Sequence, residues 1–248
     1  QLASWGYAVL SVNANRGITG RNGYTGFDMG LIYARGALVL RHLEEFYKWS
    51  KVGKTSALKI PDLDLTNKFD FSNVGLMGHS RGGEGVRYAY NIYKDAADIK
   101  WLARIPDLKI KGVFEIGPVD MGTSAGKVDA KGTAWTVLIP GCDSDVYDFS
   151  GVNPYSRMLA SQADGLPKSV FTLWGANHNF FNSQWQVSDA PHSCIGSQKP
   201  LWNTNAAALP SPFSRYDAQA RAGLIGSVEQ VNTAKGLMFA FFSAHLSD

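Results

Sequence analysis

The sequence predicts an α/β fold in which a mostly parallel sheet carries helices on both of its faces. Apolar runs typical of strands alternate along the chain with segments whose apolar residues recur at helical spacing. The 248 residues, 45% of them hydrophobic, suit one domain with a substantial core. No internal repeat or low-complexity tract divides the chain, so residues 1–248 are expected to form a single domain.

The predicted elements follow one another in an order typical of such a sheet. The predicted strands are Tyr7–Val12, Val74–Met77, Lys111–Ile116, Ala134–Ile139 and Ser169–Trp174. The predicted helices are Asp28–Trp49, Gly83–Tyr93, Pro154–Gln162 and Gly226–Leu246. Two long stretches look like loops, because Asn15–Gly26 is rich in glycine and Phe180–Pro212 is rich in Asn, Ser and Pro.

The most informative motif is LMGHSRGG, residues 76–83, at the junction of a predicted strand and a predicted helix. A G-x-S-x-G run in that context is typical of the nucleophile elbow of α/β-hydrolases, a tight turn that exposes a serine hydroxyl above the sheet. Gly78 and Gly82 flank Ser80 at positions where side chains would collide. Ser80 is therefore the predicted nucleophile, and the backbone N–H of Arg81 is one expected oxyanion donor.

A serine nucleophile needs a base and a group that orients the base, and in this fold the acid precedes the histidine along the chain. His178, in GANH after the last predicted strand, is the predicted base, with His192 as the second candidate. Asp145, in GCDSD after the preceding strand, is the favoured acid because it lies far enough along the turn to reach an imidazole. The other carboxylates that remain open are Asp143, Asp148 and Asp120.

Four stretches in the same order, LASWGYAVLSV, GLMGHSRGG, TVLIPGCDSD and KSVFTLWGANH, resemble the bacterial polyester hydrolases. These are secreted α/β-hydrolases that include polyethylene terephthalate hydrolases and cutinase-like lipases, and the elbow is also similar to that of chlorophyllases. The resemblance covers about residues 1–180 and implies Ser80 as nucleophile, Asp145 as acid and His178 as base. It further implies a secreted or periplasmic bacterial protein whose signal peptide is absent from this chain.

The departures from that family limit what the resemblance implies about substrates. Arg81 stands where the polyester hydrolases usually have Met, and Val119 where they often have a substrate-stacking Trp. The resemblance therefore supports cleavage of carboxylic esters, small or polymeric, better than cleavage of any particular polymer.

Two further expectations concern the start of the chain and its two cysteines. The nucleophile strand is the fifth of eight in the hydrolase fold but the second predicted here, so we expect the first strands and one oxyanion loop to be missing. A fragment or processed chain is the favoured explanation, and a trimmed variant of the fold is the alternative. The resemblance also implies a bridge between Cys142 and Cys194, the only two cysteines. The alternative is two unrelated buried thiols.

Four aromatic residues near His178 are candidates for a substrate pocket, although aromatic side chains close to a strand end also commonly pack in a core. These candidates are Trp174, Phe180, Phe181 and Trp185.

Several classes of function find no support in the sequence. There is no metal-binding or nucleotide-binding motif, so no metal or other cofactor is expected. The net charge of +3 comes from scattered Lys and Arg, which does not indicate a nucleic-acid surface, and no apolar run is long enough to cross a bilayer. Two alternatives to an esterase remain: an amidase or peptidase with the same triad, and a non-catalytic binding domain that retains the fold. The sequence does not predict the oligomeric state.

Overall fold

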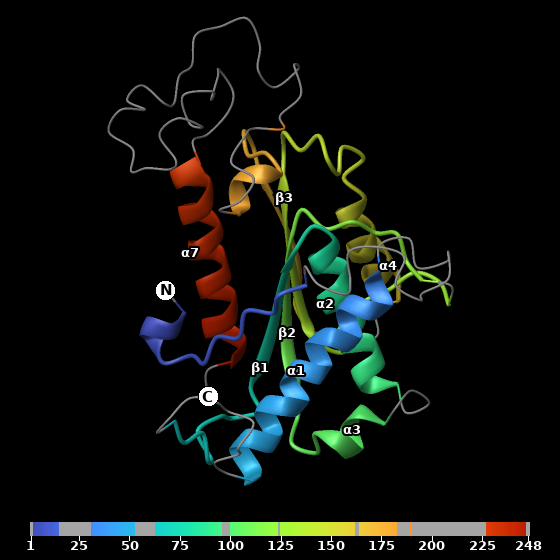
Figure 1. Cartoon of the computed structure of the whole chain (residues 1–248). Helices are drawn as coiled ribbons and strands as arrows, with labels where there is room; N and C mark the ends of the chain where they lie inside the picture. Colours follow the sequence, from blue (N-terminus) through green and yellow to red (C-terminus); the bar gives the residue numbers. More distant parts are fainter. Residues whose placement is uncertain are drawn as a thin grey trace, which may run out of the picture.

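A four-stranded parallel sheet forms the centre of the protein, which is therefore of the predicted α/β class (Figure 1). The computed structural model describes residues 2–14, 31–52, 63–95, 100–123, 125–161, 164–182, 189 and 227–246. The strands are β1 (Val74–His79), β2 (Ile110–Ile116), β3 (Ala134–Pro140) and β4 (Lys168–Leu173), in that spatial order. Each pairs in parallel with the next, so all four carboxyl ends lie at one edge of the sheet.

Helices cover both faces of the sheet, as the sequence predicts. The helix α7 (Ser227–Leu246) lies on one face, and the opposite face carries α1 (Ile32–Val52), α2 (Arg81–Lys94) and α4 (Asn153–Ser161) (Figure 1). A short helix, α3 (Trp101–Arg104), and three 3-10 turns complete the described elements; the turns are η1 (Ala3–Trp5), η2 (Ser150–Val152) and η3 (Asn179–Phe181).

The predicted strand Tyr7–Val12 is not formed, because the described residues 2–14 contain only the turn η1 and irregular backbone. Strand propensity mostly reflects the surface that a segment finds to pack against. Val9 has little protein surface to pack against, since 59% of it is exposed. Within the described part of the chain, β1 consequently pairs with β2 alone and is an edge of the sheet.

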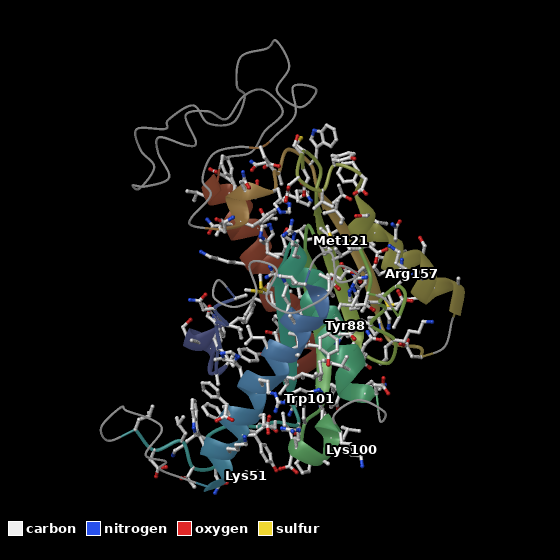
Figure 2. All side chains as sticks on the ribbon, turned by 45° about the vertical axis from the view of Figure 1, so that its right-hand side comes forward. Lys51, Tyr88, Lys100, Trp101, Met121 and Arg157 are labelled. Atoms are coloured by element: carbon white, nitrogen blue, oxygen red, sulfur yellow. The ribbon has the colours of Figure 1, made fainter. Side chains whose placement is uncertain are left out.

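The core consists of two apolar layers separated by the sheet. Every residue of β3 is buried, and its side chains alternate between the α2 face and the α7 face. On the first face Trp101, labelled in Figure 2, is fully buried. The guanidinium of Arg41 on α1 lies 5.0 Å from the centre of its ring. Among the described helices, none combines the length and the apolar character needed to cross a membrane.

A network of buried charges ties α2 to the segment between β2 and β3. Arg87 of α2 has no exposed surface, and its guanidinium donates to Asp120 and to the carbonyl oxygens of Val128 and Val119, over 2.7–3.1 Å. Asp120 also accepts two hydrogen bonds from Arg157 of α4, at 2.7 and 2.9 Å. These contacts hold α2 and α4 against the same loop.

Two buried glutamates complete this network. Both carboxylate oxygens of Glu84 accept backbone N–H groups, from Met121 at 2.9 Å and from Gly122 at 2.7 Å. Glu115 of β2 lies 3.1 Å from the Arg87 Nε and accepts a hydrogen bond from the Trp135 indole. Burial raises the pKa of Glu115 to about 7, although the Arg87 charge opposes that shift. We call Glu84, Arg87, Glu115, Asp120 and Arg157 the charge network below.

Candidate active site

The predicted site residues lie on loops that leave the carboxyl ends of the parallel strands. Ser80 directly follows β1, Asp143 and Asp145 follow β3, and His178 follows β4. The ladder between β3 and β4 continues past both strands, because Gly141 N donates to Leu173 O at 2.9 Å and Cys142 N donates to Ala176 O at 2.8 Å. This extension brings the loop of the aspartates alongside the loop of the histidine.

Ser80 occupies a tight turn between β1 and α2. Its φ of 59° and ψ of −129° lie outside the regions that non-glycine residues favour. The turn is held by hydrogen bonds from Ser80 N to Ile116 O and from Gly83 N to Ser80 O, each 2.9 Å long. A Cβ on Gly78 would overlap the carbonyl oxygen of Gly82, which explains why glycine is needed before the serine. The expected collision at Gly82 is wrong, because a Cβ there would meet no atom within 4 Å. The motif therefore forms the sharp strand-to-helix turn that the sequence predicts.

Asp143 and His178 form a buried hydrogen-bonded pair. Asp143 Oδ2 lies 2.7 Å from His178 Nδ1, and both side chains have almost no exposed surface. The other oxygen of Asp143 accepts the backbone N–H groups of Asp145 at 2.9 Å and Val146 at 2.7 Å, so the carboxylate also fixes its own turn. An Nδ1–H donor to this carboxylate leaves Nε2 as the basic atom of a neutral ring.

The carboxylate at Nδ1 is thus Asp143 and not Asp145, which the sequence analysis favoured. Asp145 is also close to the ring but on its other side, with Oδ2 3.3 Å from His178 Nε2 and a side chain that is 61% exposed. The remaining alternatives lie elsewhere: Asp120 belongs to the charge network, and Asp148 accepts the Ser150 N–H at 3.0 Å.

His178 Nε2 is buried and has no hydrogen-bond partner, so the Ser80 hydroxyl and the imidazole are not hydrogen-bonded to each other. The ring of His79, the residue before Ser80, lies against the His178 ring at 4.4 Å between centroids and is tilted by 39°, so the end of β1 contacts the histidine loop. Burial, together with the charge of His178, lowers the pKa of His79 to about 4. His79 is therefore neutral near pH 7 and packs against the site without charge.

Three residues that the sequence analysis did not select hold the histidine loop. The Gln230 side chain on α7 accepts from Asn177 N at 3.0 Å and donates to Asn177 O at 2.6 Å, and all of these groups are buried. Asp189 accepts from Ser144 N at 2.9 Å and from Asn179 N at 3.1 Å, which links the aspartate loop to the histidine loop. The one sequence signal for this contact is the polar Gln230 within an otherwise apolar predicted helix. That signal does not reveal that Gln230 bonds to Asn177.

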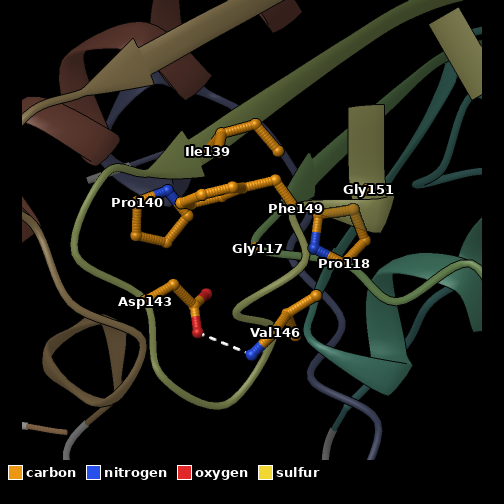
Figure 3. Close-up of a pocket in the computed structure, with 8 residues that line it drawn as sticks. All are labelled: Gly117, Pro118, Ile139, Pro140, Asp143, Val146, Phe149 and Gly151. Atoms are coloured by element: carbon orange, nitrogen blue, oxygen red, sulfur yellow. Dashed lines mark hydrogen bonds between the residues drawn. The ribbon is translucent and has the colours of Figure 1, made fainter. Parts of the chain in front are cut away.

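Gly117, directly after β2, leaves room for the Asp143–His178 pair because it has no side chain. Its φ is +45°, and a Cβ there would lie 3.2 Å from both Asp143 Oδ2 and His178 Nδ1. Beside it, a shallow crevice with no room for a water molecule is lined by Gly117, Asp143, Val146 and five further residues (Figure 3). The lining is apolar apart from Asp143, and the dashed line in Figure 3 marks the hydrogen bond that Asp143 accepts from Val146 N.

The structure supports only part of the predicted aromatic pocket, because a side chain must be exposed to contact a substrate. Trp174 is 70% exposed at the end of β4, whereas Phe180 has no exposed surface and packs inside the protein, which leaves it nothing to offer a substrate. Phe181 is partly buried, 6.0 Å from the His79 ring. Trp185 lies outside the described residues.

Other predicted features also fall on parts of the chain that the structure does not describe. These are His192, Cys194 and most of the loop Asn15–Gly26. Cys142 itself is disulfide-bonded. Arg81 is the first residue of α2, and the first amides of a helix have no acceptor within the helix, so its N–H suits the predicted oxyanion role. No group of His, Cys, Asp and Glu within the described ranges is arranged to hold a metal ion.

Comparison of the sequence with protein-family models and with curated proteins gives no match. The structural finding is a parallel α/β sheet whose carboxyl edge brings together a strained serine turn and a buried carboxylate–imidazole pair.

Proposed function

We propose that the protein is a serine carboxylic-ester hydrolase of the α/β-hydrolase type, with Ser80 as nucleophile, His178 as general base and Asp143 as the group that orients the base. The observation that supports this most strongly is the buried 2.7 Å hydrogen bond between Asp143 and His178. It fixes the tautomer whose Nε2 accepts a proton, and Nε2 has no other hydrogen bond.

In this mechanism His178 Nε2 removes the hydroxyl proton as Ser80 Oγ attacks the ester carbonyl carbon. The tetrahedral intermediate collapses when the imidazolium gives that proton to the leaving alcohol, which leaves an acyl group on Ser80. Water then attacks the acyl carbon while His178 accepts its proton, and the proton returns to Ser80 Oγ as the acid departs. The Ser80 hydroxyl must come within hydrogen-bond reach of Nε2 for the first step, and such bonds are often long in free enzymes.

The environment supports each proposed role. Ser80 lies in the turn directly before α2, and the N–H of Arg81 at the start of that helix is the proposed oxyanion donor. Polyesters are a narrower substrate proposal, for which exposed Trp174 offers an aromatic surface. The disulfide at Cys142 favours an oxidising compartment, and we therefore also propose a secreted or periplasmic location.

Hydrolysis of p-nitrophenyl acetate, butyrate and octanoate by the wild-type chain and its Ser80→Ala variant tests the proposal. Labelling with a fluorophosphonate is followed in parallel, with Ser156→Ala, an exposed serine on α4, as the matched control. We expect turnover and labelling in the wild type and in Ser156→Ala, and neither in Ser80→Ala.

Other outcomes would separate the competing functions. Labelling at Ser80 with faster cleavage of p-nitroanilides than of esters would favour an amidase or peptidase. Folded wild-type protein with neither turnover nor labelling would overturn the hydrolase proposal in favour of a non-catalytic domain. Release of soluble acids from a polyester film would support the narrower substrate class.

A further inference from the structure

His178 lies between two carboxylates, one at each ring nitrogen. Asp143 Oδ2 is 2.7 Å from Nδ1, and Asp145 Oδ2 is 3.3 Å from Nε2. The first contact is a hydrogen bond, whereas the second is close enough for an ion pair but lacks hydrogen-bond geometry. Asp145 therefore approaches the atom that the proposed mechanism requires to be free of a proton.

The two carboxylates differ in how firmly they are held. Asp143 is buried and accepts two backbone N–H groups besides its bond to the ring. The Asp145 side chain is 61% exposed, and within the described part of the chain its carboxylate accepts no hydrogen bond. Asp145 can thus leave the ring by rotation of its side chain, while Asp143 cannot leave without breaking its turn.

We propose that Asp145 is a positioning residue that retains a proton on His178 Nε2 in the resting site and thereby sets the lower pH limit for removal of the Ser80 proton. An imidazolium between two carboxylates is stabilised, and it cannot act as a base until the proton leaves. Once the ring is neutral, nothing attracts Asp145 to Nε2, and the Ser80 hydroxyl can take its place. The inference rests on the proposed function, because it concerns the base of that reaction.

The other charged groups around the ring are compatible with this role. Burial alone would lower the pKa of His178, but the hydrogen bond to Asp143 and three nearby carboxylates outweigh burial, so the pKa is raised. The third carboxylate is Asp189, which is fixed by the backbone of Ser144 and Asn179. From β1 the ring faces neutral His79, and from α7 the histidine loop faces uncharged Gln230. Asp145 is the exposed member of this set.

Nuclear magnetic resonance titration of the His178 ring tests the proposal without relying on activity. The variants are Asp145→Asn and, as matched control, Asp148→Asn, which removes an exposed charge from the same loop while its amide oxygen still caps Ser150. We expect the His178 midpoint to move to lower pH in Asp145→Asn and to stay unchanged in Asp148→Asn. An unchanged midpoint in Asp145→Asn, or equal shifts in both variants, would overturn the proposal.

The pH profile of kcat/KM on p-nitrophenyl butyrate gives the second readout. We expect the acid limb of Asp145→Asn to move to lower pH, so that below the wild-type midpoint it keeps about threefold more of its plateau rate. Because Asp145 is 61% exposed, although His178 is buried, 1 M NaCl should partly screen the pair, move the wild-type limb in the same direction and leave the variant nearly unchanged. A shifted titration without ester turnover in any variant would reject the proposed function and leave the proton-retaining contact established. Turnover with no shift would reject the role of Asp145 alone.

Discussion

The charge network under α2 and the Asp143–His178 pair are both buried and polar, yet they differ in which buried atoms have no hydrogen bond. In the network, both oxygens of Asp120 and both oxygens of Glu84 have partners, and Arg87 donates to three acceptors. Two network atoms have no hydrogen bond, Arg87 Nε and Glu115 Oε2, but they belong to two side chains that form a buried ion pair with each other. At the pair, one ring nitrogen of His178 is satisfied and the other is buried without a hydrogen bond. A network of this kind joins helices to loops, whereas a buried imidazole nitrogen without a hydrogen bond is suited to receive a proton.

The largest effect we expect comes from Asp143→Asn. The amide oxygen can still accept the N–H groups of Asp145 and Val146, so the turn should remain, but the amide nitrogen would face Nδ1 and favour the wrong tautomer. We expect kcat on p-nitrophenyl butyrate to fall by about 10³–10⁴-fold, with little change in the free energy of unfolding. A fall in kcat of less than tenfold, in a variant that folds normally, would show that Asp143 does not orient the base.

The next largest effect should come from Arg87→Met, on stability. The substitution removes the buried cation that lies between Glu115 and Asp120. We expect the free energy of unfolding in urea to fall by about 3–5 kcal/mol, because uncompensated charge remains buried. The control is Arg104→Met, whose partly exposed pair with Glu44 should contribute about 1 kcal/mol or less. Equal losses in the two variants would mean that the network does not bind α2 to its loop.

Gln230→Ala should affect both stability and activity, because this side chain on α7 holds the histidine loop. Its loss would leave the backbone N–H and C=O of Asn177 without their partner, at a cost of about 1–3 kcal/mol in the free energy of unfolding. Displacement of the histidine loop should also lower kcat by about ten- to a hundredfold. Glu229→Ala, an exposed neighbour on the same helix, is the control and should change neither quantity. Loss of stability with full activity would show that Asn177 does not position His178.

The smallest effect we expect is a change of slope in the pH dependence of stability. Since the pKa of Glu115 is raised from 4.5 to about 7, the folded protein holds a proton there that the unfolded chain releases. Stability from this group is therefore lost as pH rises from about 4.5 to about 7, at no more than about 1.4 kcal/mol per pH unit. Glu115→Gln should flatten urea midpoints across that interval, and exposed Glu45→Gln should not. An unchanged slope in Glu115→Gln would place the titrating group elsewhere.

Most of the sheet could be predicted from the sequence because each strand carries its own local signal. β2 and β3 are nearly continuous apolar runs that are buried on both faces, and α2 begins within two residues of its predicted start. Tyr7–Val12 has the same local pattern without forming a strand, because a pattern does not provide a pairing partner. The four residues of α3 are too few to show helical spacing.

The site was predictable where it depends on position after a strand and not where it depends on side-chain direction. Ser80 directly follows β1, and His178 lies in the loop after β4; both strands have strong sequence signals. Asp143 and Asp145 are two residues apart in an irregular loop, where no periodicity says which one reaches which ring nitrogen. The role of Gln230 depends on Asn177, 53 positions earlier in the chain, and spacing alone does not reveal such a contact.

The strained backbone of Ser80 also bears on how this site is maintained over evolutionary time. A non-glycine residue at φ 59° and ψ −129° costs about 1–3 kcal/mol, which glycine would relieve. Selection for stability alone would therefore favour glycine at position 80. The resulting protein would be more stable but would lack the proposed nucleophile. Under the proposed function, selection for turnover would be needed to keep a serine at this turn.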